Sequence, residues 1–185
     1  MTPMRVTAAD PDAPAAASAP PQTLDQLMAN ALAIELEAAE RYGELADVME
    51  THNNPEVAAL FRRMQAIEAL HAQAIRGEMG WTGPPPARAA ALAEPEGPET
   101  PAHDDIHYLM QPYHALAIAL AAEERAFAFF SRLAAAAEAA PVRAAAERLA
   151  AEEREHVALV RDWMSRVPRP DHDWRVDPDP PRYTD

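Results

Sequence analysis

Residues 68–71 read EALH and residues 153–156 read EREH, so the pattern Glu-x-x-His occurs twice in this chain. A further glutamate lies upstream of each pair, Glu35 before the first and Glu123 before the second. Side chains three residues apart lie on one face of an α-helix. Four carboxylates and two imidazoles from four helices form the ligand set of a carboxylate-bridged two-metal centre. The pattern therefore predicts a helix bundle with a metal site inside it.

An internal repeat sets the register of these residues. The segment around Glu35 aligns without a gap with the segment around Glu123, and the later segments align so that both Glu-x-x-His pairs superpose. The alignment selects one glutamate from each crowded stretch and leaves its neighbours out: Glu37, Glu40, Glu124, Glu152 and Glu155. The chain is thus predicted to be one helical hairpin written twice.

Apolar residues spaced three and four apart predict four helices. The expected fold is all-α: an antiparallel four-helix bundle over residues 23–166, with a long crossover between its second and third helices. The expected helices span about 23–52, 55–79, 112–139 and 141–166, and the crossover 80–111. Thr23 with Gln26 predicts a capping box, and Asn54 with Pro55 predicts a second helix start.

Proline clusters mark the segments outside these helices. Residues 1–22 are expected to form a flexible arm and residues 167–185 an extended tail. The crossover is expected to hold a short helix at 87–92. His103 and His107 in the crossover have the spacing of metal ligands on a helix, but we expect them to be exposed loop residues. Arg148, Arg154 and Arg161 are expected on the solvated surface.

Composition limits the classes of function. The 185 residues carry a formal charge of −14, which argues against nucleic acid and anionic membranes as partners. The chain has no cysteine, which excludes disulfides, thiolate catalysis and iron–sulfur clusters. No stretch approaches the ~20 apolar residues of a membrane helix, and no secretory signal is evident. We expect a cytoplasmic protein.

The six polar residues interrupt apolar stripes and are therefore expected to point inward: Glu35, Glu68, His71, Glu123, Glu153 and His156. Four unpaired buried carboxylates would each cost several kcal/mol or become protonated. Two divalent cations remove that cost, and mixed oxygen and nitrogen ligation suits iron or manganese better than structural zinc. A polar core without metal is the alternative. Tyr42 is a candidate to hydrogen-bond a ligand or donate an electron, with simple packing as its alternative.

At these residues the sequence resembles the ferritin-like superfamily, and above all its rubrerythrin branch, over residues 23–80 and 112–166. The resemblance implies two iron ions per chain, with manganese or a mixed pair as alternatives. It implies Glu68 and Glu153 as bridging ligands, and the other four residues as terminal ligands: Glu35, Glu123, His71 and His156. Tyr42 matches a tyrosine near the rubrerythrin centre.

The sequence departs from that family in two ways. A typical rubrerythrin carries a rubredoxin module, whereas this sequence has no cysteine, so an external electron donor is expected. Rubrerythrins also have an extra carboxylate one turn after the third-helix ligand, where this chain has Ala126 and Phe127. The ligand set therefore resembles the four-carboxylate, two-histidine centre of bacterioferritin.

Three functions follow as hypotheses. The first is a di-iron oxidoreductase, of peroxidase or ferroxidase type, that oxidises ferrous iron with peroxide or dioxygen, and for which a homodimer is expected. The second is iron storage or delivery as a component of a ferritin-like assembly. The third is a helical interaction module that holds no metal.

Overall fold

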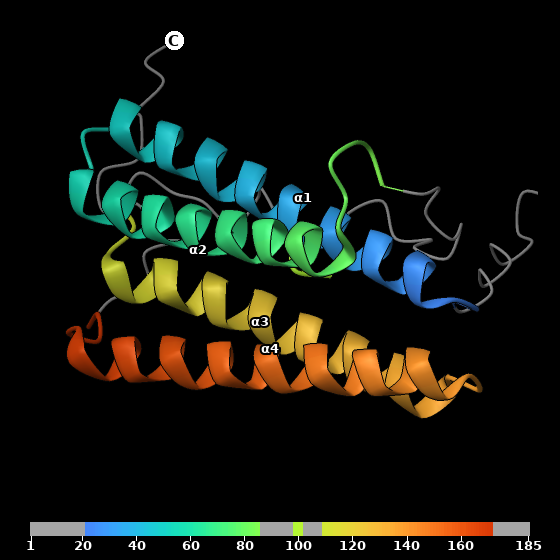
Figure 1. Cartoon of the computed structure of the whole chain (residues 1–185). Coiled ribbons are helices and arrows are strands. Elements are labelled where there is room, and N and C mark those ends of the chain that lie inside the picture. Colours follow the sequence, from blue (N-terminus) through green and yellow to red (C-terminus); the bar gives the residue numbers. More distant parts are fainter. Residues whose placement is uncertain (1–20, 86–97, 102–108, 172–185) are drawn as a thin grey trace, which may run out of the picture.

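The computed structural model describes residues 21–85, 98–101 and 109–171. These residues form four helices: α1 (Leu24–Thr51), α2 (Pro55–Met79), α3 (Pro112–Ala136) and α4 (Ala140–Arg166). Figure 1 shows α1 and α2 as one antiparallel hairpin and α3 and α4 as a second, packed side by side. No strand occurs in the described parts of the chain. The predicted all-α four-helix bundle is confirmed.

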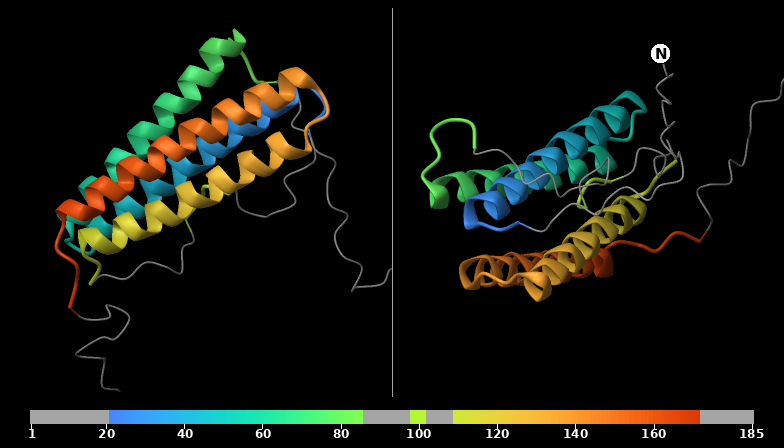
Figure 2. Two further views of the ribbon diagram at one scale, coloured as in Figure 1. Left: turned by 90° about the horizontal axis from the view of Figure 1, so that it is seen from below. Right: turned by 90° about the vertical axis from the view of Figure 1, so that its right-hand side faces the viewer.

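The connection between the hairpins runs back along the bundle. In Figure 1, α2 and α3 run in the same direction, so the chain that joins them returns over the length of a helix. The two further views in Figure 2 show the same two-hairpin arrangement from below and from one end. Of this crossover, the structure describes residues 80–85, 98–101 and 109–111. The expected short helix at 87–92, His103, His107, the arm up to residue 20 and the tail beyond residue 171 lie outside the described residues.

Local signals explain where the helices begin and end. Thr23 and Gln26 form the expected capping box at the start of α1, and the side chain of Asn54 caps α2. Gly80 ends α2 in the left-handed conformation, at φ 65°, which glycine adopts without steric cost. The third helix was expected to reach residue 139, but α3 ends at Ala136. The backbone of Ala137 is extended, and its carbonyl accepts two hydrogen bonds from the guanidinium of Arg143, at 3.2 and 2.8 Å.

The apolar core consists of two clusters, one toward each end of the bundle. The first includes Leu27, Met28, Leu32, Phe130 and Leu149, and the second includes Leu45, Met49, Phe61, Met64 and Leu116. On every helix the passage from one cluster to the other falls at a buried glutamate: Glu35, Glu68, Glu123 and Glu153. The fold therefore holds a polar layer between two apolar layers, which keep water from it on both sides.

Ion pairs link the helices at the surface. Arg148 of α4 contacts Glu78 of α2 at 2.7 Å, and Arg161 contacts Glu124 of α3 at 2.6 Å. Exposed pairs of this kind contribute roughly 0–1 kcal/mol each. Among the described residues, no helix is both long enough and apolar enough to cross a membrane.

Candidate metal centre

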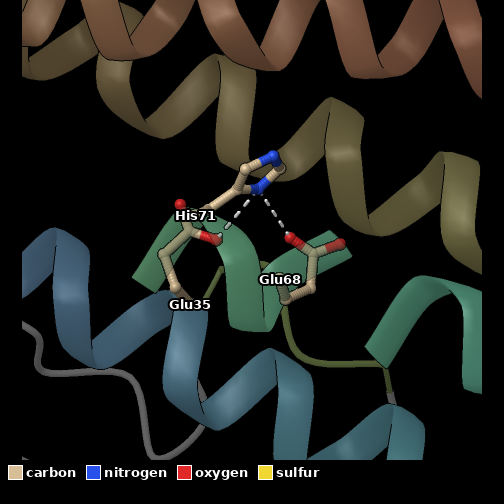
Figure 3. A group of neighbouring side chains, drawn as sticks. All are labelled: Glu35, Glu68 and His71. Atoms are coloured by element: carbon tan, nitrogen blue, oxygen red, sulfur yellow. Dashed lines mark hydrogen bonds and ion pairs between the residues drawn. The ribbon is translucent and has the colours of Figure 1, made fainter. Parts of the chain in front are cut away.

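The first hairpin brings together Glu35 of α1 with Glu68 and His71 of α2. The imidazole Nδ1 of His71 lies 3.1 Å from Oε2 of Glu68 and 3.4 Å from Oε2 of Glu35. Figure 3 shows the three side chains converging from two helices, with the ring nitrogen facing both carboxylates. Glu68 and His71 can meet because they lie one turn apart on one helix face. Each residue of this triad offers a ligand atom, all within 4.8 Å of one another.

The second hairpin repeats that geometry with Glu123 of α3 and with Glu153 and His156 of α4. Nδ1 of His156 lies 3.1 Å from Oε2 of Glu153 and 3.5 Å from Oε2 of Glu123. Its ligand atoms also lie within 4.8 Å of one another. The internal repeat of the sequence is thus also a repeat of the site.

Two contacts join the triads into one centre. The rings of His71 and His156 are stacked, with centroids 4.4 Å apart and planes 5° from parallel. A third group of ligand atoms, again within 4.8 Å, comes from Glu68, Glu123 and Glu99. Glu99 belongs to the crossover. Its two partners in this group come from different triads, Glu68 from the first and Glu123 from the second.

Burial sets the electrostatics of this layer. Glu68, Glu99, Glu123 and Glu153 are at most 1% exposed and Glu35 is 3% exposed. Removal from water raises the pKa of Glu68 and of Glu123 to about 7, and raises the pKa of Glu35 as well. The pKa of Glu99 is raised well above its usual range, first by burial and then by the four surrounding glutamates. Without a cation, the carboxylates of this layer reduce their negative charge by taking up protons.

Burial acts on the pKa of the histidines in the opposite sense, because their charged form is the protonated one. Desolvation alone lowers the pKa of each imidazole, but the neighbouring carboxylates outweigh it. Glu35 and Glu68 raise the pKa of His71 to about 10, and Glu123 and Glu153 raise the pKa of His156 to about 11. In the metal-free chain, both imidazoles therefore hold a second proton at neutral pH, in the place that a metal ion would take.

The donor set fits a pair of metal ions. Several carboxylate oxygens in the layer receive no hydrogen bond from any described residue, among them Oε1 of Glu68, Oε1 of Glu123 and both oxygens of Glu99. Buried carboxylates of this kind are stable when they bind a cation. Hard oxygen ligands with two imidazoles match iron or manganese. All six residues predicted from the sequence lie in this layer, and each triad can hold a metal ion.

Tyr42 and Glu99 stand differently toward the sequence prediction. Tyr42 is fully buried against Phe61, with ring centroids 6.1 Å apart, and no described residue hydrogen-bonds its hydroxyl. Burial and the charges of Glu123, Glu68 and Glu99 raise its pKa. Glu99 was not singled out in the sequence. It is one of three glutamates in a Pro-rich stretch, with Glu94 and Glu96, and that stretch has no helical period to select it.

Fold and site together define a helix-bundle protein with a candidate two-metal centre of carboxylates and imidazoles. The model of the rubrerythrin family matches residues 26–103 and 114–179. The chain therefore belongs to the rubrerythrin family, as its sequence pattern indicated.

One solved structure gives a further likeness. It is an uncharacterised conserved protein from Magnetospirillum magnetotacticum MS-1, 38% identical, with a TM-score of 0.61. The similarity covers 82% of this chain and 99% of the other. No curated protein matches this chain.

Proposed function

We propose that this protein binds two iron ions in the polar layer and oxidises them with hydrogen peroxide or dioxygen. The observation that carries the proposal is the convergence of two equivalent Glu-Glu-His triads in a buried layer. Membership of the rubrerythrin family supports iron as the metal. Two ferrous ions together supply the two electrons that reduce hydrogen peroxide, with two protons, to two molecules of water.

The side chains of the layer have separate tasks in this proposal. His71 and His156 would bind through Nδ1, the nitrogen that already faces the carboxylates. Glu68 and Glu153 would be the bridging ligands, and Glu35 and Glu123 would be terminal ligands, as the family resemblance implies. The raised pKa of Tyr42 keeps the proton on its phenolic oxygen, so the hydroxyl remains a donor inside the bundle.

The surroundings of the layer favour the chemistry. Apolar clusters on both sides limit access for water, and the helices that carry the six residues hold them close together. The imidazoles are the more open part of the site, at 28% and 18% exposure, so a small oxidant has its shortest route along them.

Rapid mixing of the ferrous protein with oxidant tests the proposal. The protein is loaded anaerobically with two equivalents of Fe²⁺ and mixed with peroxide or with dissolved oxygen, and the ferric absorbance is followed. We expect oxidation faster than that of free Fe²⁺ at the same pH. The exposed Glu152→Gln variant should react like the natural protein, whereas Glu68→Ala should not. A rate equal to that of free Fe²⁺ with both oxidants would overturn the proposal.

A further inference from the structure

Among the described residues, Glu99 is the one carboxylate of the polar layer that does not come from a helix. It is 0% exposed, although it lies in the crossover, and neither of its oxygens receives a hydrogen bond from a described residue. A carboxylate so placed is costly, because it has lost its hydration and gained no donor. Its burial therefore calls for a partner that the described residues do not supply.

Arg125 holds this part of the crossover in place. Its guanidinium donates one hydrogen bond to the carbonyl of Pro98, at 2.9 Å, and another to the carbonyl of Thr100, at 3.1 Å. These are the two residues that flank Glu99. Arg125 lies on α3 two residues after Glu123, so the two side chains leave opposite faces of that helix. Arg125 is exposed and Glu99 is buried. The two hydrogen bonds from the guanidinium fix the backbone on both sides of Glu99.

The position of Glu99 lies between the two triads. Its ligand atom and those of Glu68 and Glu123 lie within 4.8 Å of one another, and these two partners belong to different hairpins. A carboxylate there reaches an ion held by either triad or spans both. The structure also brings it to the layer where α3 has Ala126, one turn beyond Glu123, and offers no carboxylate.

We propose that Glu99 is a fifth carboxylate ligand of the metal pair, carried to the centre by the crossover, and that Arg125 is its positioning residue. The proposal rests on the proposed function in one respect, which is that metal occupies the two triads. Four carboxylates balance the charge of two divalent ions, and a fifth balances part of the added charge when the ions become trivalent. Glu99 therefore stabilises the oxidised pair more than the reduced pair.

Metal titration of the full chain tests the role of Glu99. The natural protein and Glu99→Gln, which keeps the shape but loses the charge, are titrated anaerobically with Fe²⁺ and with Mn²⁺ in a calorimeter. Loss of one ligand should weaken binding on the order of tenfold or more. Glu155→Gln, which removes an exposed carboxylate from α4, should bind like the natural protein. Equal affinity of Glu99→Gln and the natural protein for both ions would overturn the proposal.

Folding and coordination are measured separately. The metal-free Glu99→Gln variant should melt at or above the temperature of the natural protein, because a buried carboxylate has become neutral. Its absorption spectrum with Co²⁺ should differ from that of the natural protein, because one coordinating oxygen is lost. The midpoint potential of the iron-loaded variant should be more positive. An unchanged spectrum would count against ligation by Glu99.

A double-mutant cycle tests Arg125. Arg125→Ala should change the Co²⁺ spectrum in the same sense as Glu99→Gln, and combining the two should weaken binding no further than Glu99→Gln alone. Arg132→Ala, an exposed change on the same helix, is the control. Additive losses, or a normal spectrum in Arg125→Ala, would show that Arg125 does not position Glu99.

The outcomes separate this inference from the proposed function. If the natural protein binds two ions and oxidises iron quickly but Glu99→Gln behaves identically, only the role of Glu99 fails. The natural protein could instead bind two ions, with weaker binding in Glu99→Gln, and yet oxidise iron no faster than free Fe²⁺ is oxidised in solution. In that case the proposed function fails and Glu99 remains a ligand. A natural protein that binds neither ion contradicts both.

Discussion

The side chain of Asn54 joins the start of α2 to Met110, at the far end of the crossover. Its Nδ2 donates a hydrogen bond to the carbonyl of Met110 at 2.7 Å, and its Oδ1 accepts one from the backbone of Val57 at 3.4 Å. One residue thus caps a helix and anchors the segment that leads into α3. Met110 is 3% exposed, so water cannot easily replace that donor.

Two substitutions at Asn54 should separate these tasks. Asn54→Asp keeps the capping oxygen but loses the donor to Met110, which should cost about 1 kcal/mol of unfolding free energy. Asn54→Ala loses both contacts and should cost about 2 kcal/mol. Urea unfolding measures both values, and Thr23→Ala, which removes a cap with no crossover contact, provides the control. An Asn54→Asp variant as stable as the natural protein would contradict the anchoring role, and equal losses for the two variants would contradict the capping role.

The metal-free protein should lose stability as the pH rises. The folded pKa values of Glu68 and Glu123 are about 7, above the ordinary 4.5, and those of His71 and His156 are about 10 and 11, above the ordinary 6.5. The folded chain therefore holds more protons than the unfolded chain between each pair of values. Its unfolding free energy should fall between about pH 4.5 and 7, and again from 6.5 to about 10–11.

Metal should remove most of this dependence, because the ions replace the protons. Melting curves of metal-free and Mn²⁺-loaded protein from pH 5 to 9 measure the effect. At pH 7, calorimetry in buffers of different ionisation enthalpy should detect release of protons from His71 and His156 when metal binds. A metal-free melting temperature that rises over this pH range would contradict the assignment of charge in the layer.

Tyr42→Phe should act differently with and without metal. In the metal-free protein its buried hydroxyl has no hydrogen-bond partner among the described residues, so the substitution should be neutral or stabilising by up to about 1 kcal/mol. If the hydroxyl donates to a metal-bound carboxylate, the same change should destabilise the loaded protein by about 1 kcal/mol. Thermal unfolding of both forms measures the reversal. An equal effect in both forms would assign Tyr42 a packing role alone.

Each triad should account for one ion. His71→Ala and His156→Ala each remove the nitrogen ligand from one hairpin, so each should lower the stoichiometry from two strongly bound ions to one. Each should also reduce the melting-temperature gain on addition of Mn²⁺, because a site saturated at 100 times its Kd contributes about 2.7 kcal/mol. Metal analysis after desalting gives the count. Complete loss of both ions in both variants would show that the two triads do not bind independently.

The helices and the six clustered side chains could be predicted because they follow regular periods. A helix face repeats every three or four residues, so Glu68 and His71 had to lie together, and the duplicated register transferred the same conclusion to Glu153 and His156. The polar layer followed from Glu35 and Glu123 interrupting apolar stripes. These are local rules, and they hold wherever the chain stays helical.

Glu99 could not be predicted by such rules. Its place depends on hydrogen bonds from Arg125 to the residues beside it, and Arg125 lies 25 residues after Thr100 and looks in the sequence like an ordinary surface arginine. The end of α3 was misjudged for a similar reason, since Ala137 is as good a helix former as its neighbours. The hydrogen bonds from Arg143 that accompany the break come from the next helix. Contacts between segments that share no sequence repeat can be identified only from the three-dimensional structure.

The stacked rings of His71 and His156 are more exposed than the carboxylates of the centre. They are 28% and 18% exposed, whereas the four carboxylates that pair with them are at most 4% exposed. From outside the bundle, the imidazoles are therefore more accessible than the carboxylates of the two triads. Because the ring centroids lie 4.4 Å apart in nearly parallel planes, the two halves of the duplicated hairpin meet at this pair of rings. We therefore expect one point of access to serve both halves of the duplicated hairpin.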